Sequence, residues 1–361
     1  MPRSIGRRRK GRASSPRYAV QLIIQPDDGL APVLRAVRRA KKSIDITIFR
    51  FDRTELEEAL EAAVGRGVVV RALIAHTNRG GGQKLRKLEL RLLNAGITVA
   101  RTADDLPRYH GKMMIVDDTL YVLGFNYTKL DIEKSRSFGV ITRDRRLVKE
   151  AGALFEADRT RQSYVAGHDR LVVSPDTSRE LLSAFIRGAK KQLLIYDEKV
   201  SDNVIQRLLA GRAKAGVEIR ILGKLEKAID TVQAHKLPDR RLHVRAIVRD
   251  GRTAFVGSQS LRRLELDGRR EVGIIVTDPR VARRMQQVFE LDWAKTPIAK
   301  EAAAASAVAK DKEKDADAKN GKETKNGKEK GNGKEKGNGK EKGNGNGKEK
   351  GNGKEAVTSG A

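Results

Sequence analysis

The pattern that decides the fold of this chain is Tyr109-His110-Gly111-Lys112-Met113-Met114-Ile115-Val116-Asp117, because it has a second copy. The second copy is Leu242-His243-Val244-Arg245-Ala246-Ile247-Val248-Arg249-Asp250. In each copy a cation follows the His by two residues and an Asp follows it by seven, and Gly124 and Gly257 each lie fourteen residues after their His. A polar pattern that recurs at fixed spacing inside apolar, strand-like runs indicates an internal duplication.

The duplication extends beyond these two motifs. Each motif is preceded by a helix-like segment that leads into an apolar, strand-like segment, and each is followed by an apolar run that ends in Asp. The matching segments are residues 34–49 with 182–196, residues 67–74 with 216–222, and residues 138–144 with 272–278. The sequence therefore predicts two homologous halves, each with one His motif.

Strand and helix patterns alternate along each half. Residues 31–42 have apolar side chains at the helical period, whereas residues 43–51 alternate between apolar and polar positions, as a strand does. Residues 68–74 form a mostly apolar run, which is typical of a strand covered on both faces. We therefore predict an α/β fold in which two halves pack about a pseudo-twofold axis. Each half is predicted to be a mixed, mostly parallel sheet flanked by helices.

Changes in composition give the expected boundaries. Residues 1–17 contain basic residues and no acid, so we predict a basic disordered arm that either rests on an anionic surface or only aids solubility. The two halves are predicted to span residues 18–165 and 166–296. Residues 297–361 are predicted to be a disordered Lys/Glu/Gly/Asn-rich tail, because they contain few apolar side chains to offset the entropy of ordering.

The net charge indicates an anionic partner. The chain has 75 Lys and Arg against 47 Asp and Glu, a formal net charge of +28, which favours phosphate groups, nucleic acid or an acidic membrane surface. Aromatic residues make up 4% of the chain, which is low for a protein that stacks single-stranded bases. The absence of cysteine excludes disulfides and thiolate metal sites and fits a reducing compartment.

The sequence contains no run approaching the roughly 20 apolar residues that cross a bilayer. The basic start of the chain is not followed by an apolar run long enough for a signal peptide. We therefore expect a cytoplasmic protein, with peripheral attachment to the inner membrane face as a further expectation.

Two imidazoles supplied by two symmetric halves suit phosphodiester cleavage in two steps. One attacks phosphorus and forms a phosphohistidine, while the other protonates the leaving alkoxide and then deprotonates the incoming water or alcohol. Lys112 and Arg245 would hold the non-bridging phosphate oxygens and offset their charge. This chemistry requires no metal and no cofactor. The remaining histidines, His76, His168 and His235, lie outside the pattern and are interpreted as structural.

The paired motif resembles that of the phospholipase D superfamily, in which His-x-Lys-x4-Asp leads into a Gly-Ser-x-Asn turn. The layout is similar to its bacterial phospholipase and cardiolipin-synthase-like branches, over about residues 20–293. The resemblance implies that His110 and His243 are the nucleophile and the acid/base. It also implies catalytic roles for the remaining matched residues, which are Lys112, Asp117, Arg245, Asp250 and Glu271. Of these, Glu271 matches the carboxylate that orients a catalytic His, whereas each Asp could instead only close the turn after its strand.

The Gly-Ser-x-Asn turn is altered in both halves. Asn126 matches the motif Asn after the loss of one residue, Ser258 matches the motif Ser, and Ser260 replaces the second Asn. These three residues are predicted to bind or support the phosphate.

Two further departures make the site asymmetric. Arg245 stands where the second Lys is expected, and its planar fork places a phosphate differently from an ammonium group. Ser137 stands at the position equivalent to Glu271 and cannot orient a His as a carboxylate does. The intact Lys112 favours His110 as the nucleophile, but the assignment of the two roles stays open.

Three hypotheses follow for the function. The leading one is a phospholipase D-type phosphodiesterase or phosphatidyltransferase that cleaves or exchanges phospholipid headgroups at an anionic membrane surface. The second is a nuclease of the same superfamily, since the same chemistry and charge suit nucleic acid. The third is a catalytically weak relative that binds phosphate or nucleic acid, motivated by Ser137, Arg245 and Ser260. Both halves lie in one chain, so no obligate oligomer is expected.

Overall fold

The computed structural model describes residues 20–77 and 82–306. The predicted basic arm, residues 1–17, lies outside this part of the chain, as do residues 307–361 of the predicted tail. Residues 297–306 are helical, although the sequence predicted disorder from residue 297. The alanines at 302–305 explain the difference, because alanine has the highest intrinsic helix propensity.

The first half contains a sheet with the strand order β1-β7-β6-β5-β2-β3-β4, to which the short strand β12 is added beside β7. The strands are β1 (Gln21–Gln25), β2 (Ser43–Ile48), β3 (Val69–Ile74), β4 (Thr98–Arg101), β5 (Met113–Val116), β6 (Thr119–Leu123), β7 (Ser135–Thr142) and β12 (Arg241–Leu242). β2, β3 and β4 are parallel neighbours, and the other pairings along the path are antiparallel.

The second half repeats this arrangement in the order β8-β15-β14-β13-β9-β10-β11. Its strands are β8 (Leu171–Ser174), β9 (Gln192–Val200), β10 (Glu218–Leu225), β11 (Val232–His235), β13 (Arg245–Arg249), β14 (Thr253–Gly257) and β15 (Glu271–Val276). β9, β10 and β11 are parallel neighbours, as their counterparts are. The predicted mixed α/β fold with two homologous halves is confirmed.

The prediction that the sheets are mostly parallel is wrong, because antiparallel pairings outnumber parallel ones in each sheet. The strand that follows each His motif returns through a tight hairpin, and a hairpin joins only antiparallel strands. Helical crossovers, which produce parallel neighbours, join β2 to β3 and β9 to β10.

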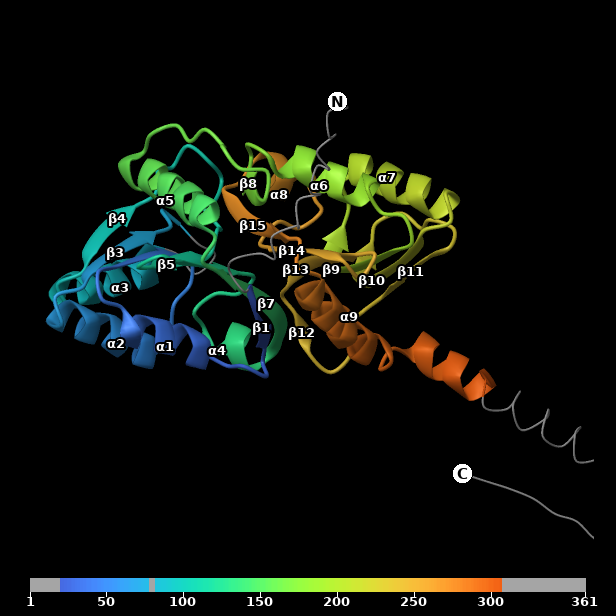
Figure 1. The fold of residues 1–361 in the computed structure, drawn as a ribbon, viewed down its shortest axis with the longest axis horizontal. Helices are drawn as coiled ribbons and strands as arrows, with labels where there is room; N and C mark the ends of the chain where they lie inside the picture. The colour runs from blue at the N-terminus through green and yellow to red at the C-terminus, as the bar shows by residue number, and fades with distance from the viewer. Residues whose placement is uncertain (1–19, 78–81, 307–361) are drawn as a thin grey trace, which may run out of the picture. The chain divides into compact units, whose positions relative to one another are not determined.

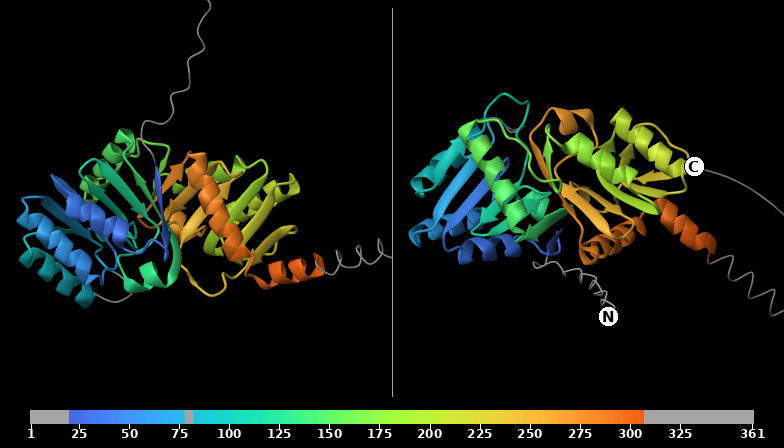
Figure 2. Two further views of the ribbon diagram at one scale, coloured as in Figure 1. Left: turned by 60° about the horizontal axis from the view of Figure 1, so that its bottom comes forward. Right: turned by 45° about the horizontal axis from the view of Figure 1, so that its top comes forward.

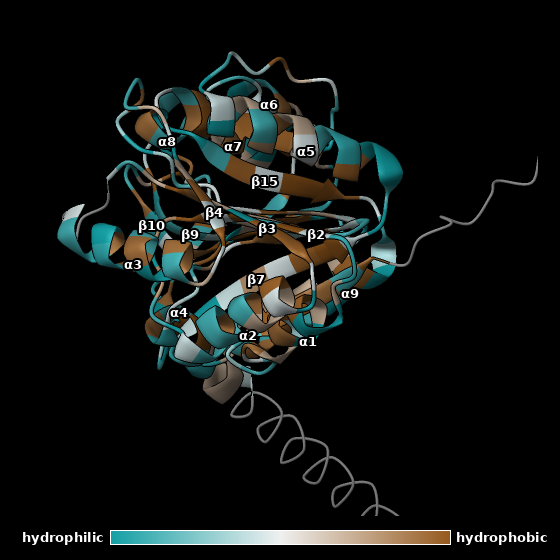
Figure 3. Ribbon diagram, turned by 90° about the vertical axis from the view of Figure 1, so that its left-hand side faces the viewer, coloured by the Kyte–Doolittle hydropathy of each residue, from teal (hydrophilic) through white to brown (hydrophobic). Residues whose placement is uncertain are grey.

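Helices cover both faces of each sheet (Figures 1 and 2). They are α1 (Ala31–Arg39), α2 (Thr54–Gly65), α3 (Gly82–Asn94), α4 (Lys129–Glu133), α5 (Arg145–Thr160), α6 (Ser178–Arg187), α7 (Asn203–Lys214), α8 (Arg263–Asp267) and α9 (Pro279–Trp293). α1, α2 and α3 share one apolar cluster with the first sheet, and α6, α7 and α8 share another with the second. In Figure 3 the helices alternate between hydrophilic and hydrophobic colours, as expected for helices with one buried face.

α5 and α9 occupy equivalent places in the two halves, each after the strand that follows the hairpin. Each begins after an aspartate cap, because Asp144 accepts the backbone N–H of Arg146 and Asp278 accepts that of Arg280. Such caps satisfy N–H groups that the first helical turn leaves unpaired. Both helices then bury apolar side chains in a core that the two halves share.

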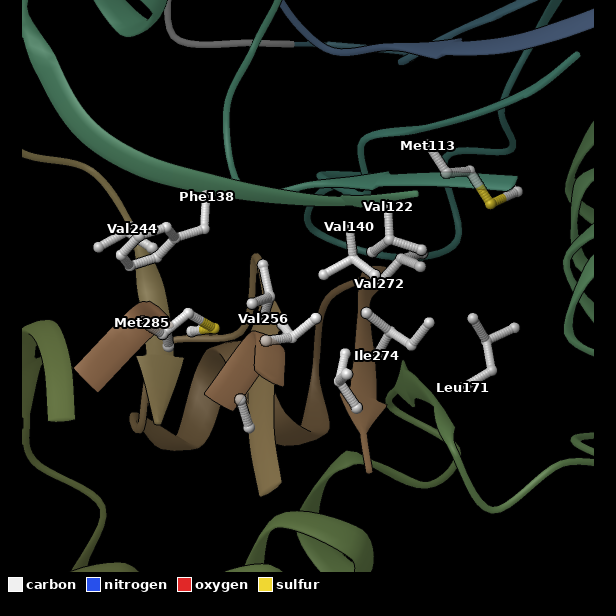
Figure 4. Packing of buried hydrophobic residues seen from close by; sticks show 14 of the residues in the cluster. Met113, Val122, Phe138, Val140, Leu171, Val244, Val256, Val272, Ile274 and Met285 are labelled. Carbon is white, nitrogen blue, oxygen red and sulfur yellow. The ribbon is translucent and has the colours of Figure 1, made fainter. Parts of the chain in front are cut away.

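The shared core holds the two halves together. Val122, Phe138 and Val140 of the first sheet lie opposite Val256 and Val272 of the second (Figure 4). Burying an aliphatic or aromatic side chain of this size contributes about 1.5–3 kcal/mol. The interface therefore fixes the geometry of any site that lies across it.

Candidate active site

Each motif histidine is attached to the opposite half of the molecule. The backbone N–H of His110 donates to the carbonyl of Arg270, with an N···O distance of 2.7 Å, and Gly111 donates to the same oxygen at 3.1 Å. In the equivalent contact, the backbone N–H of His243 donates to the carbonyl of Arg136 at 3.4 Å. Arg270 directly precedes β15, whereas Arg136 lies in β7. The site is therefore built by both halves.

Glycines allow this close approach of the halves. A Cβ atom on Gly111 would lie 2.7 Å from Cγ2 of Val272 in the other half. A Cβ atom on Gly124 would lie 2.9 Å from the carbonyl oxygen of Phe138 and 3.4 Å from that of Gly257. The 2.7 and 2.9 Å separations are too short for a larger residue unless Val272 or the backbone at Phe138 shifts, which favours glycine at both positions.

His110 is held by a buried carboxylate and a buried ammonium group. Its Nδ1 lies 2.8 Å from Oε2 of Glu271, a residue with 0% exposure. Nζ of Lys112 lies 2.7 Å from the carbonyl oxygen of His110 and 2.8 Å from its Nε2. The ring of Phe49 packs edge-on against the imidazole, with 4.5 Å between centroids. Glu271 of the other half thus contacts His110, where it can play the orienting role that the resemblance implied.

His243 has a carboxylate partner that the sequence did not reveal. Its Nδ1 lies 3.4 Å from Oδ2 of Asp131, in α4 of the first half. Asp131 in turn accepts hydrogen bonds from the backbone N–H and the side-chain amide of Asn126, at 2.9 and 2.6 Å, and from Arg241 at 2.6 Å. The first half thus places a carboxylate near His243, at ion-pair distance and without a hydrogen bond to Nδ1. One available signal was that the equivalent position in α8, Glu265, is also acidic.

The two motif cations make equivalent contacts. Arg245 donates to the carbonyl oxygen of His243 at 2.6 Å, as Lys112 does to that of His110. Both side chains are buried, with 1% exposure for Lys112 and 7% for Arg245. Arg245 also pairs with Glu198 at 3.2 Å, a carboxylate with no equivalent near Lys112, where Phe49 stands instead. The predicted asymmetry between the halves thus extends to the surroundings of the cations.

The electrostatics of the site favour neutral histidines before an anion binds. Burial holds the pKa of His110 well below its usual value, and the charges of Lys112 and Arg245 lower it further. Burial also lowers the pKa of His243; Asp131 acts against this effect, while Arg245 and Lys112 add to it. Because each cation acts on both imidazoles, the two motifs form one electrostatic site. A neutral imidazole is the form that can attack phosphorus.

Further cations and open polar atoms surround the pair. Arg108 and Arg269 act electrostatically on His110, and Arg50 acts on Lys112. Asn126 Oδ1, His243 Nδ1, Arg245 Nε and Glu271 Oε1 are among the buried side-chain atoms of the described residues that have no hydrogen-bond partner. Buried polar atoms of this kind are uncommon in folded proteins, and a catalytic role is one of the explanations for them.

Lys112 is expected to give the activity a descending limb on the alkaline side. Burial lowers the pKa of Lys112 to about 7, although the charge of Glu271 acts in the opposite direction. kcat/KM reports the free enzyme, so it should fall as the pH rises above about 7 and the ammonium loses its proton. Lys112→Arg remains charged and should move this limb to higher pH. Identical alkaline limbs in both proteins would show that Lys112 is not the titrating group.

The two motif aspartates lie at the far ends of β5 and β13 and are not brought to the histidines. Asp117 accepts the backbone N–H groups of Lys41, Lys42 and Ser43, at 3.0, 2.8 and 3.0 Å. Asp250 does the same for residues 190–192, at 2.7 to 3.2 Å. Each also has a positive φ, of 52° and 54°, in the hairpin turn. Each Asp is needed at the hairpin turn, where it binds the backbone between the preceding helix and strand. This explains why it lies at the same distance in sequence from the His in both halves.

Replacing Asp117 by alanine should therefore reduce stability and leave turnover per folded molecule unchanged. Burial acts to raise the pKa of Asp117, but the three N–H groups outweigh it and hold the pKa below its usual value. This contribution to stability is thus present at neutral pH and lost as the pH falls through the folded-state pKa. We expect a loss of about 1–3 kcal/mol in the free energy of unfolding, measured by urea denaturation. Asp118→Ala, in the same turn but exposed, is the control, and a large fall in kcat for Asp117→Ala would contradict this assignment.

The turn residues predicted to bind phosphate have different surroundings. Asn126 reaches the site through Asp131. Ser258 exchanges hydrogen bonds with the backbone of Val272, and it also acts to lower the pKa of Glu271 against the larger effect of burial. Ser260 donates to the buried carboxylate of Asp197, so its hydroxyl is engaged away from the histidines. Of the three, Asn126 has the clearest place beside the pair.

Residues 20–77 and 82–306 contain neither a candidate metal site nor a candidate membrane span. No group of three His, Cys, Asp or Glu side chains in this part of the chain is arranged to hold a metal ion. None of the helices described there is long and apolar enough to span a membrane.

A family model described as "Cardiolipin synthase, PLD-like domain" matches residues 33–159 and again residues 181–293, together more than half of the chain. No curated protein sequence gives a significant match.

Among solved structures, the polyphosphate kinase of Porphyromonas gingivalis is similar, with a TM-score of 0.64, 19% identity, and coverage of 76% of this chain and 50% of the kinase. This chain thus spans about half the length of that protein. Phosphatidylserine synthase of Haemophilus influenzae Rd KW20 has a TM-score of 0.59 and 12% identity, covering 81% of this chain and 94% of the synthase. Nuc of Salmonella typhimurium, a phospholipase D family member, has a TM-score of 0.37 and 25% identity, covering 42% of this chain and 99% of Nuc. The first two likenesses support the two-half fold.

Proposed function

The chain belongs to the phospholipase D superfamily, in the group with cardiolipin-synthase-like domains, and from this premise we propose that it transfers or hydrolyses phosphodiesters through a phosphohistidine. The observation that carries the proposal is the composite site. Each half supplies one His and one buried cation, and each His has a carboxylate beside its Nδ1. A nucleophile and an acid/base in a cationic site are the groups that two-step phosphoryl transfer needs.

In this proposal His110 is the nucleophile. Glu271 contacts Nδ1, so Nε2 is the nitrogen that attacks phosphorus, after Lys112 turns from Nε2 to the bound phosphate; a P–N bond forms and the P–O bond to the leaving group breaks. Lys112 and Arg245 neutralise the non-bridging oxygens as charge shifts in the transition state. The closer carboxylate contact, 2.8 Å at His110 against 3.4 Å at His243, supports this assignment.

His243 is then the acid/base, oriented by Asp131. A bound phosphodiester brings a negative charge that raises the pKa of His243, so the imidazole can carry a proton on Nε2 when the substrate is in place. It gives this proton to the leaving alkoxide. In the second step it takes a proton from water or an alcohol, whose oxygen attacks phosphorus and breaks the P–N bond.

The substrate class we favour is phospholipid, with cleavage or exchange of the headgroup. The net charge of +28 supports attachment to an anionic leaflet, where each well-placed cation adds about 1 kcal/mol. Peripheral binding at the inner membrane face is part of this proposal, and so is function without an obligate oligomer. Nucleic acid is the second candidate, because the same charge attracts it. The third hypothesis, a catalytically weak relative, loses much of its motivation because Asp131 supplies the carboxylate that Ser137 lacks.

The test offers both substrates to the same proteins. Phosphatidylcholine/phosphatidylglycerol vesicles with a primary alcohol should yield phosphatidyl-alcohol with the wild type and not with His110→Ala or His243→Ala. His168→Ala is the matched control, because His168 contacts the backbone N–H of Arg170 outside the site. Cleavage of DNA without lipid turnover, lost in the same two variants, would replace lipid by nucleic acid as the substrate. Anion binding without turnover would support the third hypothesis.

A further inference from the structure

A buried ion pair connects β7, which binds the backbone of His243, to α9 of the second half. Arg136 of β7 forms a two-point contact with Asp292 of α9, with its Nε 2.7 Å from Oδ2 and its Nη2 3.1 Å from Oδ1. The hydroxyl of Tyr196 donates to the same carboxylate at 2.8 Å. The side chains of Arg136 and Asp292 are only 6% and 4% exposed. The pair therefore connects the first half to the second inside the protein.

A second pair occupies the equivalent position. Arg270, next to β15, has its Nε 3.1 Å from Oδ1 of Asp158 in α5. Its Nη1 donates to the carbonyl oxygen of Ser174 at 3.0 Å and pairs with Asp176. Arg136 makes the corresponding contacts to the first half, donating to the carbonyl oxygen of Gln25 at 2.8 Å and lying 3.6 Å from Asp27. The duplication has thus preserved a whole polar network as well as the His motif.

The backbone carbonyls of these arginines receive the N–H groups of the two motif histidines. Arg270 accepts from His110, and Arg136 accepts from His243. We propose that the Arg136–Asp292 and Arg270–Asp158 pairs position the two motif histidines. Each pair fixes the backbone of its arginine, whose carbonyl accepts the N–H of a histidine from the other half. This inference rests on the proposed function, because it assigns the pairs a role in that reaction.

A purely stabilising role explains these pairs poorly. Moving two charges out of water costs several kcal/mol per ion, and replacing such a pair by apolar side chains is often neutral or stabilising. A buried pair does restrict geometry, since each charge must keep its partner. Reacting groups are sensitive to such restriction, because a displacement of about 1 Å can cost about 10²-fold in rate.

The two pairs should affect different steps of the reaction. The Arg270 pair positions His110, so its loss should slow formation of the phosphohistidine from every substrate. The Arg136 pair positions His243, so its loss should slow formation of the phosphohistidine only from substrates whose leaving group needs a proton. Nitrophenolate leaves without one, whereas the alkoxide of choline does not.

The experiment compares the rate of the first turnover, measured as release of nitrophenol or choline before the steady state, for phosphatidyl-p-nitrophenol and phosphatidylcholine in Asp292→Asn and Asp158→Asn. Burial raises the pKa of Asp158 to about 6, so assays at pH 8 compare the ionised carboxylate with the amide. We expect Asp292→Asn to lose roughly 10- to 100-fold with phosphatidylcholine and less than about 3-fold with the nitrophenyl ester. Asp158→Asn should lower both by similar factors. Glu290→Gln, the same chemical change on α9 at a half-exposed pair with Arg220, should change neither.

A second variant keeps the proposal testable if Asp292→Asn does not fold. Arg136→Met combined with Asp292→Leu removes both charges and should keep the melting temperature within a few degrees, while showing the same selective loss. Equal losses on both substrates in a folded Asp292 variant, or no loss in the double variant, would overturn the proposal. If the wild type turns over neither ester nor DNA, the proposed function fails and the positioning role falls with it. A normal wild type with unselective variants refutes the positioning role alone.

Discussion

Replacing His110 by alanine is expected to lower phosphodiester turnover by roughly 10⁴-fold or more, the scale on which removal of a catalytic nucleophile acts. The variant lacks the nitrogen that forms the P–N bond, and water must then attack directly. The neighbouring groups Glu271, Lys112 and Arg245 remain, so substrate binding should weaken much less than kcat. Steady-state kinetics with the phospholipid or nucleic acid that the wild type accepts measures this split.

Stability supplies the control for His110→Ala. Burial disfavours the charged imidazole, so the variant should fold with a melting temperature close to that of the wild type. His168→Ala, treated in the same way, should keep full activity. A folded His110→Ala protein that retains more than about a tenth of the wild-type rate would exclude His110 as the nucleophile.

Replacing His243 by alanine should lower turnover by about 10²–10⁴-fold for substrates with alkoxide leaving groups. A nitrophenyl ester should still release one equivalent of nitrophenolate, because this leaving group departs without a proton donor. The reaction should then stop at the phosphohistidine, since no base remains to activate water. A rapid burst followed by slow turnover is the expected time course.

Imidazole added to the His243→Ala reaction should restore part of the second step. Loss of the burst itself, with a folded protein, would show that His243 is needed before the P–N bond forms and would favour exchange of the two roles. Asp131→Asn is expected to resemble a weaker form of His243→Ala, because its carboxylate lies beside Nδ1.

The sequence predicted the parts of this fold that are local or repeated. The duplication revealed the two halves, and the resemblance to the phospholipase D superfamily pointed to Glu271. The sequence could not reveal that the backbone N–H of each His binds a carbonyl of the other half. Spacing along the chain carries no information about which half supplies that carbonyl. Asp131 was missed for the same reason, since it meets His243 only through packing of α4 against the other half.

Another error came from applying a local rule where contacts between distant segments determine the structure. Alternation of helices and strands suggested mostly parallel sheets, but it does not specify which strands become neighbours, and the hairpins made most pairs antiparallel. For Asp117 and Asp250 the sequence left two roles open, a catalytic one implied by the resemblance and a structural one in the turn after the strand. Both carboxylates accept backbone N–H groups between a helix and a strand, which favours the structural role.

The composite site also explains why both halves of the duplicated chain are needed. Half the chain would contain one His and one cation but not the carbonyl and carboxylate that orient them. Glu271 contacts His110 and Asp131 contacts His243, and both contacts cross the interface between the halves. In the proposed mechanism the two histidines of a single chain have different roles, and the differences between Lys112 and Arg245 and between Glu271 and Asp131 would give each His its own pKa.

The most direct test of the central claim is mass spectrometry of the His243→Ala protein quenched after mixing with phosphatidyl-p-nitrophenol. Digestion at neutral pH preserves an acid-labile P–N bond. The account predicts a phosphatidyl group on the peptide that contains His110, and no such group in the His110→Ala/His243→Ala double variant. An unmodified His110 peptide despite release of nitrophenolate, or a group attached elsewhere, would contradict it.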